Sequence, residues 1–251
     1  MDGLLRERAA SLTGILNGVD TAEWNPAHDG RIAAVFNRGD LAGKVRCKAA
    51  LRRALGLSQD ASGPVFGIVS RLTSQKGLDW VLQALPKMTL RGGQLALLGT
   101  GERELEEGFA AAAKRFRRSV AVRIGYDETL AHRIIAGADV ILVPSRFEPC
   151  GLTQLYGLAY GTLPLVRRVG GLADTVQDAD AAGIAAGTAT GFAFDEPNVG
   201  ALENALDRVF EVWNVRPDWS RLQSAAMQQD FSWAPSARRY LEVYRQLRTE
   251  A

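Results

Sequence analysis

Short apolar runs alternate with longer amphipathic runs through the middle of the chain. The apolar runs are residues 65–69, 94–98, 120–124, 139–143 and 163–166, with 191–194 as a candidate sixth. They are almost continuously apolar, as strands are when helices cover both faces of a parallel sheet. We therefore expect five strands, and a sixth if the last run joins them.

Helical patterns fill the intervals between these strands. They cover residues 77–87, 102–118, 128–137 and 152–160, after a basic amphipathic helix over 40–57 with Asp40 as its N-cap and Gly56 near its end. Three more helices are expected over 199–214, 220–229 and 236–247, whereas 179–190 is interpreted as a loop of small residues. Strand–helix alternation with short connections predicts an α/β fold, a Rossmann-like doubly wound parallel sheet with helices on both faces.

Composition and charge narrow the functional classes. The 251 residues include 30 basic and 28 acidic side chains, and this balance gives no support for a nucleic-acid or membrane-surface partner. The two cysteines are too few for a disulfide framework, and no apolar run reaches the roughly 18 residues of a spanning helix. No secretory signal is visible. We expect a cytoplasmic protein, with no membrane and no nucleic acid among its partners.

The most informative segment follows the run 139–143. It reads Pro144-Ser-Arg-Phe-Glu-Pro-Cys-Gly-Leu-Thr-Gln154 and leads into the expected helix 152–160. Glu148, Gly151 and Thr153 thus stand where a strand ends and a helix begins, which is where open α/β sheets bind ligands and where free N–H groups hold phosphate. The segment predicts an anionic ligand such as a nucleotide diphosphate. Cys150 has no base beside it, so we expect a contact residue and not a nucleophile.

Two further strand ends carry candidate ligand groups. Arg71 and Lys76 follow the first strand, where their cations would bind phosphate, although two solvated loop charges explain them equally well. Tyr126 follows the third strand, where its ring would stack on a base or merely cover the sheet end while Asp127 caps the next helix. Both interpretations stay open for all three residues.

Other motifs argue against competing enzyme classes. Gly99 and Gly101 begin a dinucleotide fingerprint, but Glu104 occupies the position of its third glycine. This favours a tight turn over a Rossmann oxidoreductase. The two histidines, His28 and His132, stand apart in sequence, which disfavours a metal site or a histidine-centred hydrolase.

Taken together, the motifs resemble one family. The matching runs are 14–20 with 24–26, 70–79, 99–101, 144–156 and 161–168 with 170–174, in order over nearly the whole chain. They resemble bacterial glycogen synthases and plant starch synthases of glycosyltransferase family 5, the retaining ADP-glucose:glucan transferases. The resemblance implies the carboxy-terminal domain of a GT-B fold, with residues 1–30 as an interdomain segment and 31–251 as the nucleotide-sugar-binding domain.

The resemblance also implies roles for individual residues. The residues implied as catalytic are Arg71 and Lys76 on the diphosphate and Glu148 on the transferred glucose. Those implied to bind the nucleotide sugar are Ser70, Tyr126 (on adenine), Cys150, Gly151, Leu152 and Thr153. Where the wider family often has a second glutamate, this chain has Tyr156, so no paired-carboxylate mechanism follows. No metal or other cofactor is implied, and the partners are ADP-glucose or ADP and an α-1,4-glucan.

The length departs from the family pattern. A full enzyme of this family has an amino-terminal domain with a Lys-Thr-Gly-Gly-Leu-like loop, and this sequence contains no such loop. We therefore expect a bacterial carboxy-terminal half with nucleotide affinity and little or no transferase activity. We also expect dimerisation through the surface that would contact the amino-terminal domain. The alternative is a stand-alone module that binds nucleotide or glucan without catalysis.

Overall fold

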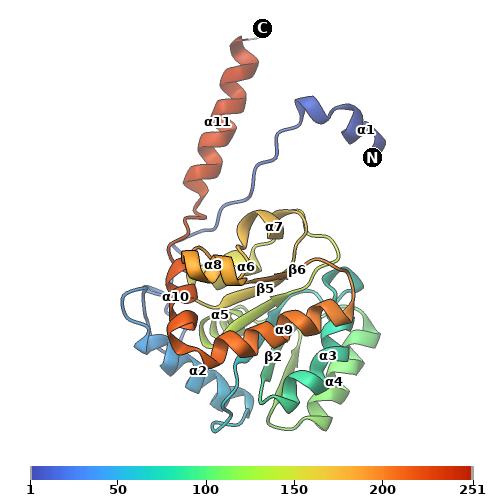
Figure 1. The fold of residues 1–251 in the computed structure, drawn as a ribbon, viewed down its shortest axis with the longest axis vertical. Helices are drawn as coiled ribbons and strands as arrows, with labels where there is room; N and C mark the ends of the chain where they lie inside the picture. Colours follow the sequence, from blue (N-terminus) through green and yellow to red (C-terminus); the bar gives the residue numbers. More distant parts are fainter. Residues whose placement is uncertain (1, 250–251) are drawn as a thin grey trace.

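The computed structural model describes residues 2–249, and within them six parallel strands form one sheet in the order β3-β2-β1-β4-β5-β6. The strands are β1 (Val65–Val69), β2 (Gln94–Gly99), β3 (Val120–Ile124), β4 (Val140–Val143), β5 (Leu163–Arg167) and β6 (Phe192–Phe194). The candidate sixth strand thus joins the sheet. Figure 1 shows the sheet in the body of the molecule with helices in front of it and behind it.

Helices cover both faces because successive strand residues point to opposite sides. In β4, Val140 and Leu142 join one core, whereas Ile141 and Val143 join another. The helices are α1 (Asp2–Glu7), α2 (Ala42–Leu55), α3 (Leu78–Leu90), α4 (Arg103–Arg115), α5 (Glu128–Gly137), α6 (Thr153–Ala159), α7 (Gly171–Thr175), α8 (Ala181–Ala186), α9 (Val199–Asn214), α10 (Arg216–Ala226) and α11 (Trp233–Thr249), with short 3₁₀ turns η1 (Ala9–Ser11) and η2 (Ser74–Lys76). Helices α3, α4 and α9 pack in the first core, and α2 and α5 lie across the sheet. The predicted doubly wound sheet is confirmed.

Differences from the expected elements have local causes. The region interpreted as a small-residue loop contains α8, because Asp180 caps it by accepting a hydrogen bond from the Gly183 N–H at 2.7 Å. Helix α4 ends at Arg115, before the expected 118, and Arg118 has a left-handed φ of 66°. Helix α10 begins four residues early, with a proline in its first turn.

The strand order decides where the motifs meet. Strand β1 pairs with β2 on one side and with β4 on the other. The direction in which strands are added reverses at β1 and β4, and such a switch point leaves a crevice at the carboxyl ends of the two strands. The segment with Arg71 and Lys76 and the segment with Glu148 leave these two strands, so the topology brings them together.

Part of the amino-terminal segment packs on the body. The Trp24 ring lies between the His132 and Tyr156 rings, with centroid distances of 3.8 Å to each. The buried Asp29 carboxylate accepts a hydrogen bond from the Tyr160 hydroxyl and lies 2.7 Å from His132 Nδ1. His132 is therefore a buried packing histidine. The assignment of residues 1–30 as an interdomain segment stays a prediction.

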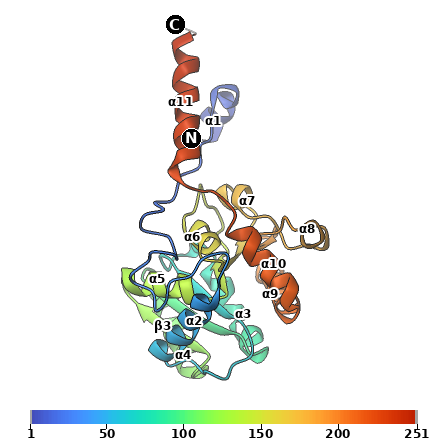
Figure 2. The same cartoon turned by 90° about the vertical axis from the view of Figure 1, so that its left-hand side faces the viewer.

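Helix α11 projects from the body, and α1 lies on the same side of the molecule (Figures 1 and 2). Its exposed large side chains are Trp233, Tyr240, Leu241, Tyr244 and Leu247. A row of apolar side chains in water is typical of a surface that packs against another body. Among residues 2–249, no helix is long and apolar enough to cross a membrane.

The burial of Lys44 predicts that the stability of the fold depends on pH. Its ammonium is buried and donates to Thr162 Oγ1 at 2.6 Å and to the Ala136 carbonyl at 3.1 Å. Burial lowers the pKa of Lys44 from 10.5 to about 7. Between these values the unfolded chain holds the proton that the folded chain has lost, so the free energy of unfolding rises with pH.

Replacing Lys44 by methionine should remove this pH dependence. From pH 7 to 9 we expect the wild-type free energy of unfolding to gain about 1 kcal/mol per pH unit relative to Lys44→Met. Urea unfolding of both proteins at pH 7, 8 and 9 measures the difference. If the two stability curves stay parallel over that range, Lys44 keeps its proton in the fold.

Candidate functional site

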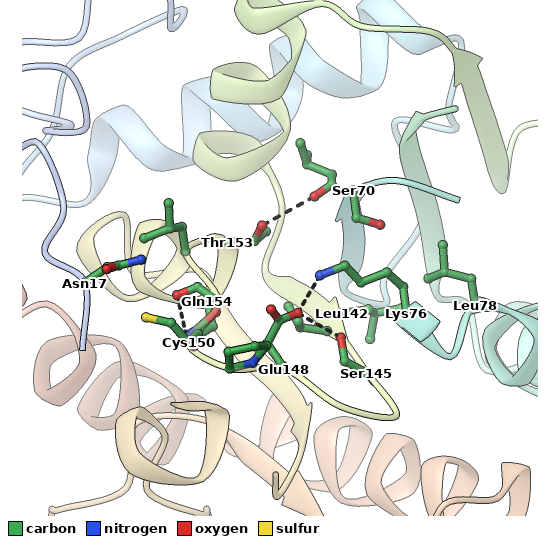
Figure 3. Close-up of a pocket in the computed structure, with 15 residues that line it drawn as sticks. Asn17, Ser70, Lys76, Leu78, Leu142, Ser145, Glu148, Cys150, Thr153 and Gln154 are labelled. Carbon is green, nitrogen blue, oxygen red and sulfur yellow. Dashed lines mark hydrogen bonds and ion pairs between the residues drawn. The ribbon is translucent and has the colours of Figure 1, made fainter. Parts of the chain in front are cut away.

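Two loops enclose a cavity of about 350 Å³ at the carboxyl ends of β1 and β4. Figure 3 shows that side chains from both loops point into the same space. The lining residues are Asn17, Val69, Ser70, Lys76, Leu78, Leu142, Val143, Ser145, Glu148, Pro149, Cys150, Gly151, Leu152, Thr153 and Gln154. Seven of the nine residues predicted for the site therefore line one cavity.

Lys76 and Glu148 form an ion pair across the cavity. Lys76 Nζ donates to Glu148 Oε2 at 2.5 Å, and the Ser145 hydroxyl donates to the same oxygen at 3.2 Å (Figure 3). Glu148 is 9% exposed, so its carboxylate is largely out of water. The pair places one mobile cation and one acceptor carboxylate side by side, which suits a ligand with both an anionic and a hydroxyl-rich part.

Arg146 ties the two loops together. Its guanidinium donates to both Asp79 oxygens at 2.7 Å, and its backbone N–H donates to the Gln75 carbonyl at 2.8 Å. The hydrogen bonds between the two groups raise the pKa of Arg146. They are also the main cause that lowers the pKa of Asp79. Arg146 also lies over the Trp80 ring. This bidentate pair fixes the distance between the Lys76 loop and the Glu148 loop.

The Glu148 loop packs against two glycines from the turn after β5. A Cβ on Gly170 would lie 2.2 Å from the Glu148 carbonyl oxygen, and one on Gly171 would lie 2.4 Å from that of Cys150. The Gly171 N–H also donates to the Glu148 carbonyl at 3.2 Å. Only residues without side chains allow this approach, so the two glycines hold the loop in place.

A second, mostly apolar cavity of about 270 Å³ adjoins the first, and Val69 and Ser70 line both. Arg71 and Tyr126 lie here, and the Tyr126 ring is 88% exposed. Asp127 caps α5 by accepting a hydrogen bond from the Leu130 N–H at 2.8 Å, as expected if this segment only closes the end of the sheet. The ring next to it remains open to a flat ligand. All nine predicted residues thus line one or the other of two adjoining cavities.

Three further residues at the site are not among those predicted from the sequence. Asn17 reaches the cavity from the amino-terminal segment, and Ser145 contacts the carboxylate of Glu148. Gln154 is fully buried, and its Oε1 has no hydrogen-bond partner among the described residues. An unpaired buried acceptor beside a cavity is available to a ligand hydroxyl. Asn17, Ser145 and Gln154 all stand inside the motif runs that carry the family resemblance, and this position is the signal that could have identified them.

Metal-binding geometry is not found around these loops. Among residues 2–249, no group of three or more histidine, cysteine, aspartate and glutamate side chains could hold a metal ion. Positive charge at the cavities comes from Arg71 and Lys76, and the start of α6 contributes backbone N–H groups that have no partner within the helix and no side-chain cap. The arrangement suits phosphate next to a neutral, hydroxylated group.

Comparisons with known proteins identify the family of the chain. The sequence model of the family "Glycosyl transferases group 1" matches residues 56–223. The glycogen synthase of Francisella tularensis subsp. tularensis is 53% identical over 248 residues, which cover 98% of this chain and 51% of that protein. The chain therefore spans about half the length of the curated relatives it matches.

Solved structures show the same fold. The catalytic domain of starch synthase IV from Arabidopsis thaliana, bound to ADP and acarbose, superposes with a TM-score of 0.91 at 38% identity, over 97% of this chain and 50% of that one. Sucrose-phosphate synthase from Thermosynechococcus elongatus superposes with a TM-score of 0.66 at 22% identity, over 100% of this chain and 57% of that one. The second likeness concerns the fold alone.

Proposed function

Because this chain belongs to the group 1 glycosyl transferases, we propose that it supplies the ADP-glucose site of a glycogen synthase. The observation that carries the proposal is the meeting of Lys76, Glu148 and the start of α6 around one cavity, with Arg71 and Tyr126 in the next. Support comes from the relatives, one of which is a glycogen synthase and another a starch synthase bound to ADP and acarbose. A cytoplasmic location in a bacterium is part of this proposal.

In the proposed reaction, glucose leaves ADP and joins the non-reducing end of an α-1,4-glucan with retention of configuration. Negative charge grows on the diphosphate as the bond to glucose breaks. Arg71 and Lys76 stabilise this charge because both cations stand at the edge of the sheet where the diphosphate binds. Glu148 contacts the glucose, and Tyr126 stacks on adenine. Backbone and side-chain donors of the segment Cys150, Gly151, Leu152 and Thr153 line the glucose and phosphate pocket. The two cations supply the electrostatic stabilisation, so the proposal invokes no metal.

The acceptor glucan and a second domain also belong to the proposal. The exposed apolar side chains of α11 supply a surface on which such a domain would pack, and two copies of this chain would dimerise there in its absence. We expect the 251-residue chain by itself to bind nucleotide and to transfer little or no glucose, because its relatives are about twice as long.

Calorimetric titration tests the nucleotide assignment. ADP should bind more tightly than UDP, because the cavity beside Tyr126 would stack a purine over a larger area than a pyrimidine. Glucose incorporation from ADP-glucose into glycogen is measured in parallel on the same protein. Absence of ADP binding would refute the site, whereas robust turnover by this chain alone would refute the proposed dependence on a second domain.

A further inference from the structure

A second large pocket lies at the amino ends of β1 and β4, whereas the Glu148 cavity lies at their carboxyl ends. It measures about 490 Å³ and is bounded by α2, the loop between α2 and β1, the start of β4 and the α9–α10 junction. Its lining residues are Leu41, Lys44, Val45, Lys48, Ala49, Arg52, Gln59, Ala61, Ser62, Asp139, Trp213, Arg216, Trp219, Ser220 and Gln223, and we call it the basic pocket. The four residues of β4 separate it from the Glu148 cavity by about 13 Å.

Helix α2 supplies most of the charge. Lys44, Lys48 and Arg52 stand four residues apart, so they share one face of the helix, and that face lines the pocket. Arg216 adds a fourth cation from α10. The basic character of this helix is plain in the sequence, and the nucleotide-sugar site does not use it.

One carboxylate faces these four cations. Asp139 is the only acidic side chain among the lining residues, and Lys48 Nζ already lies 2.6 Å from its Oδ2. The same oxygen also accepts the Val65 N–H at 2.7 Å. The pocket therefore carries a formal excess of three positive charges when Lys44 is protonated.

The other cations bond to oxygens without formal charge. Arg52 donates to Gln94 Oε1 at 2.7 Å and to backbone carbonyls, and Lys44 donates to the Thr162 hydroxyl and a carbonyl. The Arg216 guanidinium is exposed and lies 4.1 Å above the Trp213 ring. Like charges held together at a partly desolvated surface repel one another, and an anion placed between them offsets that cost.

We propose that the basic pocket binds a small phosphate monoester at a site separate from the Glu148 cavity. The exposed guanidinium of Arg216 has its forked donors available for two phosphate oxygens, and Lys48 faces the same space as a second cation. The organic part of the ligand lies along the apolar lining formed by Val45, Ala49 and Trp219. The volume admits a molecule of sugar-phosphate size and is larger than a bare phosphate needs.

Nuclear magnetic resonance tests the proposal residue by residue. Inorganic phosphate and ribose 5-phosphate are titrated into the ¹⁵N-labelled chain at low ionic strength, where charge interactions are screened least. We expect saturable shifts of the amides of Lys48, Ser62 and Arg216, with ribose 5-phosphate binding more tightly than phosphate. Because signals are resolved by residue, binding at the Glu148 cavity does not obscure the result.

Two charge reversals provide the matched comparison. Arg216→Glu should weaken the affinity measured at these amides by about tenfold or more, because it replaces a phosphate-binding cation with a repelling charge. Arg46→Glu makes the same change on the exposed opposite side of α2, outside the pocket, and should alter it by less than about twofold. The milder Arg216→Gln serves as a second variant with little effect on the fold.

Three outcomes would overturn the proposal. The first is the absence of saturable shifts at the amides of the basic pocket. The second is an equal loss of affinity in Arg216→Glu and Arg46→Glu, which would show attraction by overall charge alone. The third is equal affinity for phosphate and ribose 5-phosphate, which would exclude recognition of a monoester.

Discussion

Replacing Lys76 by alanine should lower the affinity of the chain for ADP by about a hundredfold, because a charged hydrogen bond to phosphate contributes about 1.5–3 kcal/mol. The change also leaves the Glu148 carboxylate without its cation, and Glu148 is 9% exposed. An unpaired carboxylate beside the diphosphate adds repulsion to the lost attraction. Calorimetric titration of ADP into wild type and Lys76→Ala measures the effect.

Lys87→Ala is the matched control. Lys87 also pairs with a carboxylate, that of Asp207 at 2.7 Å, but it lies on α3 outside both cavities. We expect its ADP affinity to stay within about twofold of wild type. A loss of less than about threefold in Lys76→Ala would contradict the assignment of Lys76 to the diphosphate.

A double variant separates the two causes of the loss. Glu148→Gln removes the carboxylate charge while it keeps the shape of the side chain. If Lys76 binds phosphate directly, Lys76→Ala combined with Glu148→Gln should recover only part of the lost affinity. Complete recovery would mean that Lys76 acts only by neutralising Glu148.

Gly77→Ala should destabilise the fold by about 3–4 kcal/mol, the largest stability effect we expect from a single methyl group. Gly77 has a φ of 65°, and a Cβ there would lie 2.1 Å from the Pro144 carbonyl oxygen. The residue connects the Lys76 turn to α3, and Pro144 begins the Glu148 segment. The methyl group would therefore push apart the two loops that form the cavity. Urea unfolding measures the loss of stability.

Gly56→Ala isolates the clash from the backbone conformation. Gly56 has nearly the same φ, 69°, but a Cβ there would meet no atom within 4 Å. Its substitution should cost only about 1 kcal/mol, which is the strain of a left-handed alanine. Similar losses in the two variants would show that the Pro144 contact adjusts at no cost. We also expect weaker ADP binding in Gly77→Ala and unchanged binding in Gly56→Ala.

Local patterns were sufficient for the strands, for most of the helices and for the parts of the candidate site that follow strands. Each expected strand lies within one residue of its position in the sheet, because a buried parallel strand is a short apolar run that few other structures resemble. The sequence also predicted which candidate residues follow strand ends, namely Arg71, Lys76, Tyr126 and Glu148. The small-residue helix α8 was missed because its capping by Asp180 outweighs a weak apolar pattern.

Contacts between distant segments were decided by the tertiary structure alone. The Asp79–Arg146 pair joins residues 67 positions apart, and the Asp29–His132 contact joins residues 103 positions apart. Neither segment by itself shows which distant residue it will contact. The basic face of α2 was visible in the sequence, but only packing against α10 and the start of β4 made it a pocket.

The sequence by itself determined the order of the strands along the chain, the helices that connect the first five of them, the family and the chemical groups at each strand end, because these depend on the spacing of side chains along one segment. The tertiary structure alone decided that β4 lies beside β1, and with it the 2.5 Å contact between Lys76 and Glu148. Pairing of strands depends on the packing of the whole sheet, whose free energy is shared among many distant residues and leaves no mark on any one of them.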